Sequence, residues 1–176
     1  MFTRAILIFT GIIAVLFILG AGIRCAQAAP VCSMWSAERV EARASTAGPY
    51  LDEVTGALSE LGLPPRWVYL MLEESGGRPE AKSQAGALGP WQLTAATAKR
   101  YGCTDRTDPR EATLAAGRYI LHLLDAFDGD EAAVVMAYNM GGSNLKKYGP
   151  SQSARALSAL VMCAFYHDPL FLNGYK

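Results

Sequence analysis

Apolar residues recur at steps of three and four along much of the chain, which is typical of one buried face of an α-helix. Leu51, Val54, Leu58 and Leu61 form the clearest such run, and Gly62 ends it. Comparable patterns predict further helices over residues 36–43, 94–101, 108–124, 130–138 and 153–166. No alternating pattern predicts a strand, so the chain beyond its N-terminal segment is predicted to form one all-α domain.

Capping residues set the expected starts of several helices. Thr94 and Asp130 stand where a side-chain oxygen can accept a hydrogen bond from the first helical turn. Asp108 is followed by a proline and, three residues on, by Glu111, which predicts a capping box. In that box the Glu111 carboxylate accepts a hydrogen bond from the main-chain N–H of Asp108. Gly141-Gly142 are predicted to end the helix that Asp130 begins.

The stretch 66–75 differs from the others because it is apolar on nearly all sides, which predicts a helix buried in the core. Glu73 and Glu74 stand at its end, and Gly76-Gly77 stop it. Burial at the rim of the core raises the pKa of a carboxyl by disfavouring its charged form. A carboxyl that stays protonated near neutral pH can donate a proton to a leaving oxygen, so Glu74 is a candidate general acid. Taken alone, Glu74 would more often be an ordinary solvated glutamate.

The N-terminus has the pattern of an export segment. Arg4 precedes residues 5–23, which carry no charge and are mostly apolar, and Ala26-Gln27-Ala28 is a small-residue site for a signal peptidase. Residues 1–28 are predicted to be a cleaved signal peptide. The alternative is a retained inner-membrane anchor, because 5–23 nearly reaches the roughly 20 apolar residues that span a bilayer. Both interpretations put residues 29–176 outside the cytoplasm, in the periplasm or secreted.

Charge and cysteine content exclude several classes of protein. The 16 basic residues balance the 16 acidic ones without forming a basic stripe, which argues against a nucleic-acid partner. With two histidines and no zinc-type cysteine spacing, no metal or other cofactor is expected. Outside the cytoplasm, Cys32, Cys103 and Cys163 allow one disulfide and one free thiol, and their spacing leaves the pairing open.

A glycine-rich loop follows the glutamate pair. Residues 86–92 read Gly-Ala-Leu-Gly-Pro-Trp-Gln, and glycines let a main chain approach a ligand closely. Trp91 offers an apolar face on which a sugar ring can stack, and Gln92 offers a donor and an acceptor. A turn around a buried tryptophan explains the same pattern equally well.

A third group of polar residues ends a later helix. Tyr138 and Asn139 follow Ala137 directly before two glycines. A hydroxyl and an amide at a helix end can hold a carboxyl or the acetamido group of a sugar. The alternative is a core tyrosine beside an asparagine that ends the helix.

Taken in order, these residues resemble the lytic transglycosylase family with the SLT, or goose-lysozyme-like, catalytic domain. The resemblance runs from about residue 61 to residue 145, and the segments 63–65, 97–102 and 108–113 are similar to the membrane-bound murein transglycosylase D type. It implies that residues 29–176 form a lysozyme-like helical domain that cleaves peptidoglycan glycan strands.

The resemblance also implies roles for single residues. Glu74 matches the one catalytic acid/base, and Ser75 the serine that helps hold the sugar or the glutamate. Gln92 matches a substrate-binding glutamine, Tyr138 the tyrosine that hydrogen-bonds the catalytic carboxyl, and Asn139 its companion in the groove. The implied reaction breaks the bond between N-acetylmuramic acid and N-acetylglucosamine and closes a 1,6-anhydro ring. A hydrolytic muramidase and a non-catalytic glycan-binding or scaffold protein remain alternatives.

Two features depart from the family's pattern. Gly77 and Arg78 stand where members often carry an aromatic residue and an asparagine, which predicts a reshaped groove lip. No cell-wall-binding repeat follows the catalytic domain, so the protein is expected to reach its substrate through one domain, a membrane anchor or a partner. Secretion, conjugation and phage machines are the candidate partners.

Overall fold

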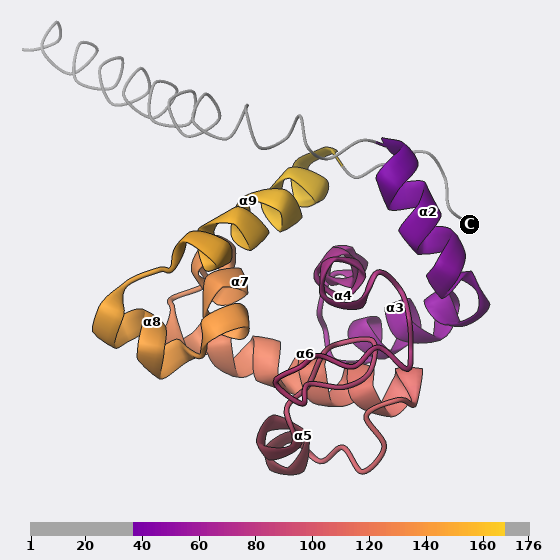
Figure 1. Cartoon of the computed structure of the whole chain (residues 1–176), viewed down its shortest axis with the longest axis horizontal. Coiled ribbons are helices and arrows are strands. Elements are labelled where there is room, and N and C mark those ends of the chain that lie inside the picture. The colour runs from indigo at the N-terminus through magenta and orange to yellow at the C-terminus, as the bar shows by residue number, and fades with distance from the viewer. Residues whose placement is uncertain (1–36, 168–176) are drawn as a thin grey trace, which may run out of the picture.

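The structure, a computed structural model, describes residues 37–167 (Figure 1). The apolar segment 5–23, the predicted cleavage site at Ala26-Gln27-Ala28 and the predicted helix cap at position 36 lie outside the described residues. Within residues 37–167, no helix is both long enough and apolar enough to cross a bilayer.

The described residues are helical. The helices are α2 (Ala37–Ala47), α3 (Leu51–Glu60), α4 (Val68–Ser75), α5 (Ala95–Tyr101), α6 (Pro109–Ala126), α7 (Glu131–Met140), α8 (Gly142–Tyr148) and α9 (Gln152–His167), with 3-10 turns at Gly48–Tyr50 and Pro65–Trp67. Between residues 37 and 167 there is no strand, and only two isolated bridges join Leu88 to Lys82 and to Leu93. The predicted all-α fold is confirmed.

Helix α4 lies in the middle of the molecule, with α2 on one side and α9 on the other (Figure 1). Every residue from Val68 to Leu72 is buried, as the apolar pattern of this stretch predicts. Around α4, helix α3 packs on α6, and α6 packs on both α5 and α7. Because α4 is enclosed up to its last turn, its C-terminal end is the place where this buried helix first meets solvent.

The predicted helix starts are confirmed at three positions. The side chains of Thr94, Asp108 and Asp130 each accept a hydrogen bond from the main-chain N–H three residues later, at 3.1, 2.7 and 3.1 Å. The second half of the predicted capping box is wrong. The Glu111 carboxylate instead accepts hydrogen bonds from the main-chain N–H groups of Thr104 and Asp105, at 2.5 and 3.1 Å. It binds the preceding loop because that loop's N–H groups have no helical partner of their own.

Two helix boundaries differ from the prediction. Helix α2 runs to Ala47, beyond the expected end at residue 43, and Gly142 begins α8 rather than a loop. Gly141 ends α7 as predicted, so the predicted Gly141-Gly142 stop is correct at its first residue only. A Cβ atom at position 142 would lie 3.3 Å from the Leu123 side chain. The glycine therefore lets α8 pack directly against α6, a tertiary contact that no local pattern encodes.

Candidate active site

Glu74 occupies the last turn of α4 and is partly buried. Burial is the main cause that raises the pKa of its carboxyl to about 7, and the neighbouring charge of Glu73 is the second. Among the residues that the structure describes, no hydrogen bond or ion pair involves this carboxyl. Glu74 is therefore a group that can carry a proton near neutral pH and is not committed to another side chain.

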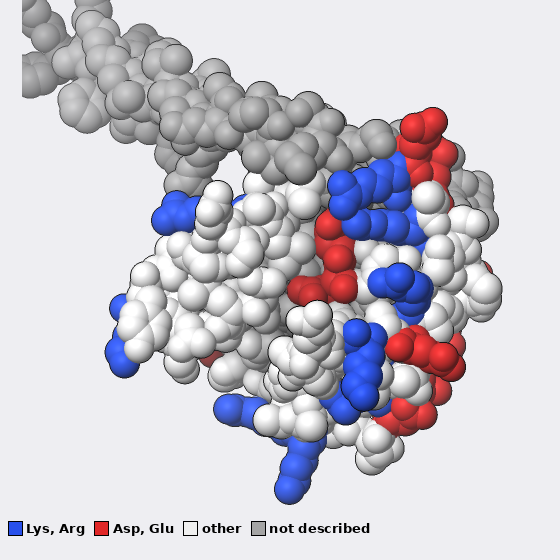
Figure 2. Space-filling view, viewed as in Figure 1, with Lys and Arg blue, Asp and Glu red and all other residues white. Residues whose placement is uncertain are grey.

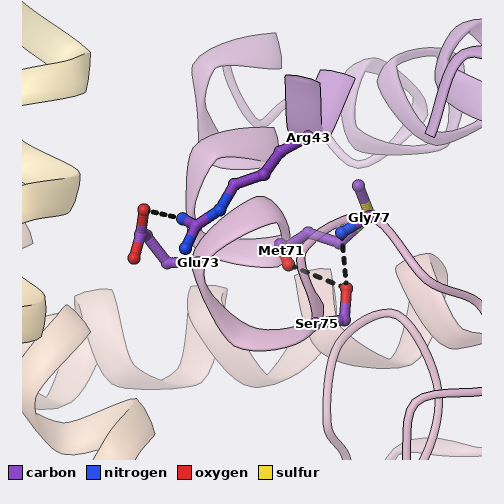
Figure 3. A network of polar contacts seen from close by, with 5 residues as sticks. All are labelled: Arg43, Met71, Glu73, Ser75 and Gly77. Carbon is purple, nitrogen blue, oxygen red and sulfur yellow. Dashed lines mark hydrogen bonds and ion pairs between the residues drawn. The ribbon is translucent and has the colours of Figure 1, made fainter. Parts of the chain in front are cut away.

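Glu73 has the opposite environment. Its carboxylate forms an ion pair with Arg43 of α2, and its side chain is only 5% exposed (Figure 3). In the space-filling view, acidic atoms at the position of α4 lie between basic side chains over α2 and an uncharged surface over α9 (Figure 2). The two adjacent glutamates are thus distinguished by their partners, which supports the choice of Glu74 over Glu73 as the reacting group.

Ser75 lies behind the site rather than in it. The residue is 1% exposed, and its hydroxyl donates to the Met71 carbonyl and accepts from the Gly77 N–H, both at 3.1 Å (Figure 3). These hydrogen bonds fix the end of α4. Of the two expected roles, contact with a sugar is not available to a side chain so enclosed, and the hydroxyl bonds the main chain on either side of Glu74 rather than its carboxyl.

Gly77 packs against α2. Its φ of +75° is a left-handed conformation, and a Cβ atom there would lie 2.5 Å from the main-chain oxygen of Arg43. The Tyr50 hydroxyl donates to the Gly77 carbonyl at 2.5 Å. These contacts leave no room for a side chain at position 77, and the reshaped lip stays a prediction. The main chain of α2 therefore occupies the space that a side chain at position 77 would need, and Arg78 remains exposed beside it.

Trp91 does not offer a face to a ligand, which corrects the expected sugar-stacking role. It is 0% exposed, and its indole N–H donates to the Thr113 hydroxyl at 2.8 Å. The loop places the tryptophan in the core because its large apolar surface there anchors the loop to α6. The alternative interpretation, a turn around a buried tryptophan, is the one that the structure bears out.

The next residue, Gln92, faces a pocket of about 270 Å³ that Tyr138 and Asn139 also line. The Gln92 amide nitrogen donates to the carbonyls of Ala81 and Gly89, at 2.8 and 2.9 Å. These bonds hold the side chain in one orientation. The backbone of Gln92 has a φ of +49°, a conformation that residues other than glycine seldom adopt. The structure therefore brings Gln92, Tyr138 and Asn139 together around one pocket, whereas Ser75 and Trp91 are buried and do not line it.

Tyr138 connects this pocket to Glu74, but not through the expected hydrogen bond. Its hydroxyl donates to the Trp91 carbonyl at 2.9 Å. Burial raises the pKa of Tyr138 well above its usual value, and the nearby charges of Glu74 and then Tyr119 raise it further. The Trp91 carbonyl accepts the tyrosine's hydrogen bond because the loop presents that carbonyl to the hydroxyl.

Two residues of the site were missed by sequence reasoning. Arg43 lies 30 positions before its partner Glu73, and nothing in its local pattern marks it. Tyr119 of α6 packs beside Tyr138, with ring centroids 5.3 Å apart. Tyr119 and His122 stand three residues apart on α6. This spacing was the one available signal that an aromatic and polar stripe runs along that helix.

Of the cysteines within residues 37–167, one is bonded and one is free. Cys163 is disulfide-bonded, and Cys103 is a free, buried thiol that contacts the Asp105 carbonyl at 3.3 Å. Burial raises the pKa of Cys103 to about 11. The expected combination of one disulfide and one free thiol is thus present, with the partner of Cys163 outside the described residues.

Comparison with known proteins gives the family. The family model described as the transglycosylase SLT domain matches residues 57–161. This chain belongs to the transglycosylase SLT domain family. The resemblance read from the ordered glutamate, loop and tyrosine motifs is confirmed.

Several SLT-domain relatives are known by name. The chain is 33% identical over 118 residues to membrane-bound lytic murein transglycosylase D of Escherichia coli (strain K12), which covers 64% of this chain and 26% of that protein. It is 42% identical over 74 residues to peptidoglycan transglycosylase gp16 of Escherichia phage T7, covering 38% and 6%. It is 33% identical over 99 residues to the transglycosylase of Enterobacteria phage PRD1, covering 56% and 37%. The chain thus spans about a quarter of the length of the first of these relatives. Arg43 and α2 lie before the part that matches the SLT family model.

Proposed function

We propose that this protein is a peptidoglycan lytic transglycosylase that cleaves the β-1,4 bond between N-acetylmuramic acid and N-acetylglucosamine without water. The observation that carries the proposal is the Glu74 carboxyl, which is unpaired, has a pKa raised to about 7, and lies near enough to Tyr138 for its charge to act on that residue, one of those that line a pocket together with Gln92 and Asn139. The printed names of the relatives, which are murein and peptidoglycan transglycosylases, support the same substrate.

A single carboxyl has to perform both proton transfers in this reaction. Most glycosidases use two carboxylates. In the described part of this chain, the carboxylate whose charge acts on Glu74 is Glu73, and Arg43 already neutralises it. We therefore assign the second role to the substrate itself, whose acetamido group stabilises the positive charge that develops at the muramyl C1.

The steps balance as follows in atoms and protons. Protonated Glu74 donates its proton to the glycosidic oxygen as the bond from that oxygen to C1 breaks. The Glu74 carboxylate then takes the proton of the muramyl 6-hydroxyl, and the freed oxygen forms the new bond to C1. The product is a 1,6-anhydro ring, and Glu74 ends the cycle protonated.

The surrounding residues hold the reactants. Tyr138 lies close enough for the Glu74 charge to affect its pKa, so its hydroxyl oxygen is available to orient the protonated carboxyl. Gln92 and Asn139 supply amide groups at the pocket for the hydroxyl and acetamido groups of a sugar. Ser75 acts through the end of α4 rather than by touching substrate.

The experiment is digestion of purified sacculi, with mass spectrometry of the released fragments. The transglycosylase proposal expects anhydro ends, which weigh one water less than the reducing ends of a hydrolytic muramidase. Glu74→Gln is expected to abolish release while its far-ultraviolet circular dichroism stays unchanged. Reducing ends would establish the muramidase alternative, and undiminished release by Glu74→Gln would refute the role of Glu74. If neither protein releases fragments, a non-catalytic glycan-binding role takes the proposal's place.

We further propose that the protein acts outside the cytoplasm and opens the wall locally for a larger machine. Two of the named relatives belong to phages, which supports a local role. Fractionation of cells that express the tagged protein tests the location. A defect in secretion, conjugation or phage entry in a Glu74→Gln strain, with normal growth and cell shape, is the expected phenotype.

A further inference from the structure

A second pocket lies beside the one that contains Gln92. It has a volume of about 330 Å³ and is formed between α5, α6 and α8. The two pockets share Thr97 and Tyr119 in their walls, so they are neighbours along the surface. A ligand that occupies the Gln92 pocket can therefore extend into the second pocket without leaving the protein surface.

A row of aromatic rings follows the same direction. The ring centroids of Tyr138 and Tyr119 are 5.3 Å apart, and those of Tyr119 and Tyr101 are 5.2 Å apart. The row ends at His122, whose ring centroid is 6.3 Å from that of Tyr101. These spacings are those of packed aromatic pairs, so the row forms a rigid wall from the Glu74 side of the site into the second pocket.

The second pocket is basic. Arg100, His122 and Lys146 line it, and its lining includes no aspartate or glutamate. The Lys146 ammonium lies 5.0 Å above the Phe127 ring, and the Arg100 guanidinium lies 5.8 Å from the Tyr101 ring centre. Within residues 37–167 neither cation forms an ion pair with a carboxylate.

The two cations come from different helices and face the pocket from two sides. Arg100 belongs to α5 and Lys146 to α8, and basic side chains are visible over both helices in Figure 2. Both are held against aromatic walls of the pocket itself, which restricts their side chains before any ligand arrives. The charge of Arg100 also reaches Tyr119, where it partly opposes the increase in pKa that burial causes.

We propose that this basic pocket binds the carboxylates of the peptide stem carried by a muramyl residue of the substrate. The proposal rests on the proposed function, because only a peptidoglycan strand places such a stem beside the glycan at Gln92. The sugar backbone of the glycan is uncharged, and its negative charges lie on acidic substituents. Cations without protein partners at the end of a sugar groove therefore match the carboxylates of the stems. The pocket then selects strands that still carry peptides.

The test compares the full chain with two charge-matched variants. The pocket variant is Arg100→Gln with Lys146→Gln. The control variant is Lys99→Gln with Lys147→Gln, which removes equal charge from exposed neighbours on the same two helices outside the pocket. Each is made in the Glu74→Gln background, so that binding is measured without turnover.

Binding of three ligands is followed by calorimetry. These are a chito-oligosaccharide without carboxylates, a muramyl oligosaccharide that keeps only its lactyl carboxylates, and the same oligosaccharide with peptide stems. The protein is expected to prefer the stem-bearing ligand. The pocket variant is expected to lose about five- to tenfold in affinity for that ligand alone, because two exposed charge pairs are removed. The control variant is expected to keep the preference.

Each other result overturns the proposal in a distinguishable way. Equal losses in both variants would mean general charge attraction, and equal affinity for the last two ligands would move the contact to the lactyl group. A protein that digests sacculi yet shows no preference for stems overturns the pocket proposal alone. A protein that neither binds the glycans nor digests sacculi overturns the proposed function, and this proposal with it.

Discussion

Arg43 of α2 forms an ion pair with Glu73, the residue directly before the proposed acid Glu74. Successive residues of an α-helix point about 100° apart, so neighbouring carboxyls can face different surroundings. Here one meets a guanidinium and the other meets a largely buried, unpaired environment. Two adjacent glutamates thus acquire different chemistry from the helices that pack beside them.

Removing Arg43 is expected to destabilise the fold. In Arg43→Gln the Glu73 carboxylate, only 5% exposed, is left without its cation. Loss of one partner from a buried pair costs about 3–5 kcal/mol, and the partial exposure of Arg43 reduces the expected loss to roughly 2–4 kcal/mol. Urea unfolding measures it. The double variant with Glu73→Gln should recover much of the loss, and a double variant as unstable as Arg43→Gln would contradict the explanation.

The activity is expected to fall as pH rises through neutrality. Glu74 must be protonated to act as the acid, and its pKa is about 7, so the rate on sacculi should drop about tenfold per pH unit well above that value. Glu73→Gln removes the smaller of the two causes of the raised pKa. Its alkaline limb should therefore move to lower pH, though not as far as the ordinary glutamate value. A rate that stays constant up to pH 9 would rule out Glu74 as the acid.

The same raised pKa has a consequence for stability. The folded protein binds the Glu74 proton more tightly than the unfolded chain, so this contribution is present below about pH 4.5 and is lost as pH rises through about 7. Glu74→Gln has no such loss. Its free energy of unfolding relative to the natural protein should rise between pH 4 and pH 8 by up to roughly 3 kcal/mol. A difference that is independent of pH would mean that the carboxyl is not desolvated.

Two glycines of the loop 86–92 offer a matched comparison. Both have positive φ, but a Cβ atom at Gly89 would lie 1.6 Å from the Arg106 carbonyl oxygen, whereas one at Gly86 would meet nothing within 4 Å. Gly86→Ala is expected to cost about 1–2 kcal/mol from backbone strain alone. Gly89→Ala should cost more and displace Gln92, with loss of digestion. Equal unfolding midpoints for the two variants would contradict this.

The hydrogen bond beneath the loop makes a further prediction. The Thr113 hydroxyl accepts from the Trp91 indole at 2.8 Å and donates to the Pro109 carbonyl at 2.6 Å. Thr113→Val leaves the buried indole N–H unpaired, which should cost about 1–3 kcal/mol. Thr55→Val removes a surface hydroxyl that bonds within its own helix, and its effect should stay within about 0.5 kcal/mol. Thermal unfolding of both variants gives the comparison.

Local patterns predicted the helices well because caps and apolar spacing act over a few residues. Thr94, Asp108 and Asp130 cap as expected, and the buried stretch before Glu74 is a buried helix. The failures depend on packing between distant segments. Glu111 turned to the preceding loop, and α8 was missed because Gly142 looks like a stop until α6 lies beneath it.

The candidate site was predicted in identity more than in geometry. The order of the motifs along the chain was enough to select Glu74, Gln92, Tyr138 and Asn139 as candidate site residues. The motif order did not indicate that Trp91 is buried, because a tryptophan in a glycine-rich loop can face either the core or the solvent. Nor could it show that the Tyr138 hydroxyl donates to a main-chain carbonyl, since that hydrogen bond depends on how the loop and α7 meet.

The position of α2 determines which residues a shortened form of this protein has to keep. The family match begins at residue 57, after α2 has ended at Ala47. A fragment trimmed to the match would keep every motif that identifies the family. It would also leave the carboxylate of Glu73 without its cation and Gly77 without its cover. The smallest fragment that is recognisable by homology is therefore smaller than the smallest fragment expected to fold.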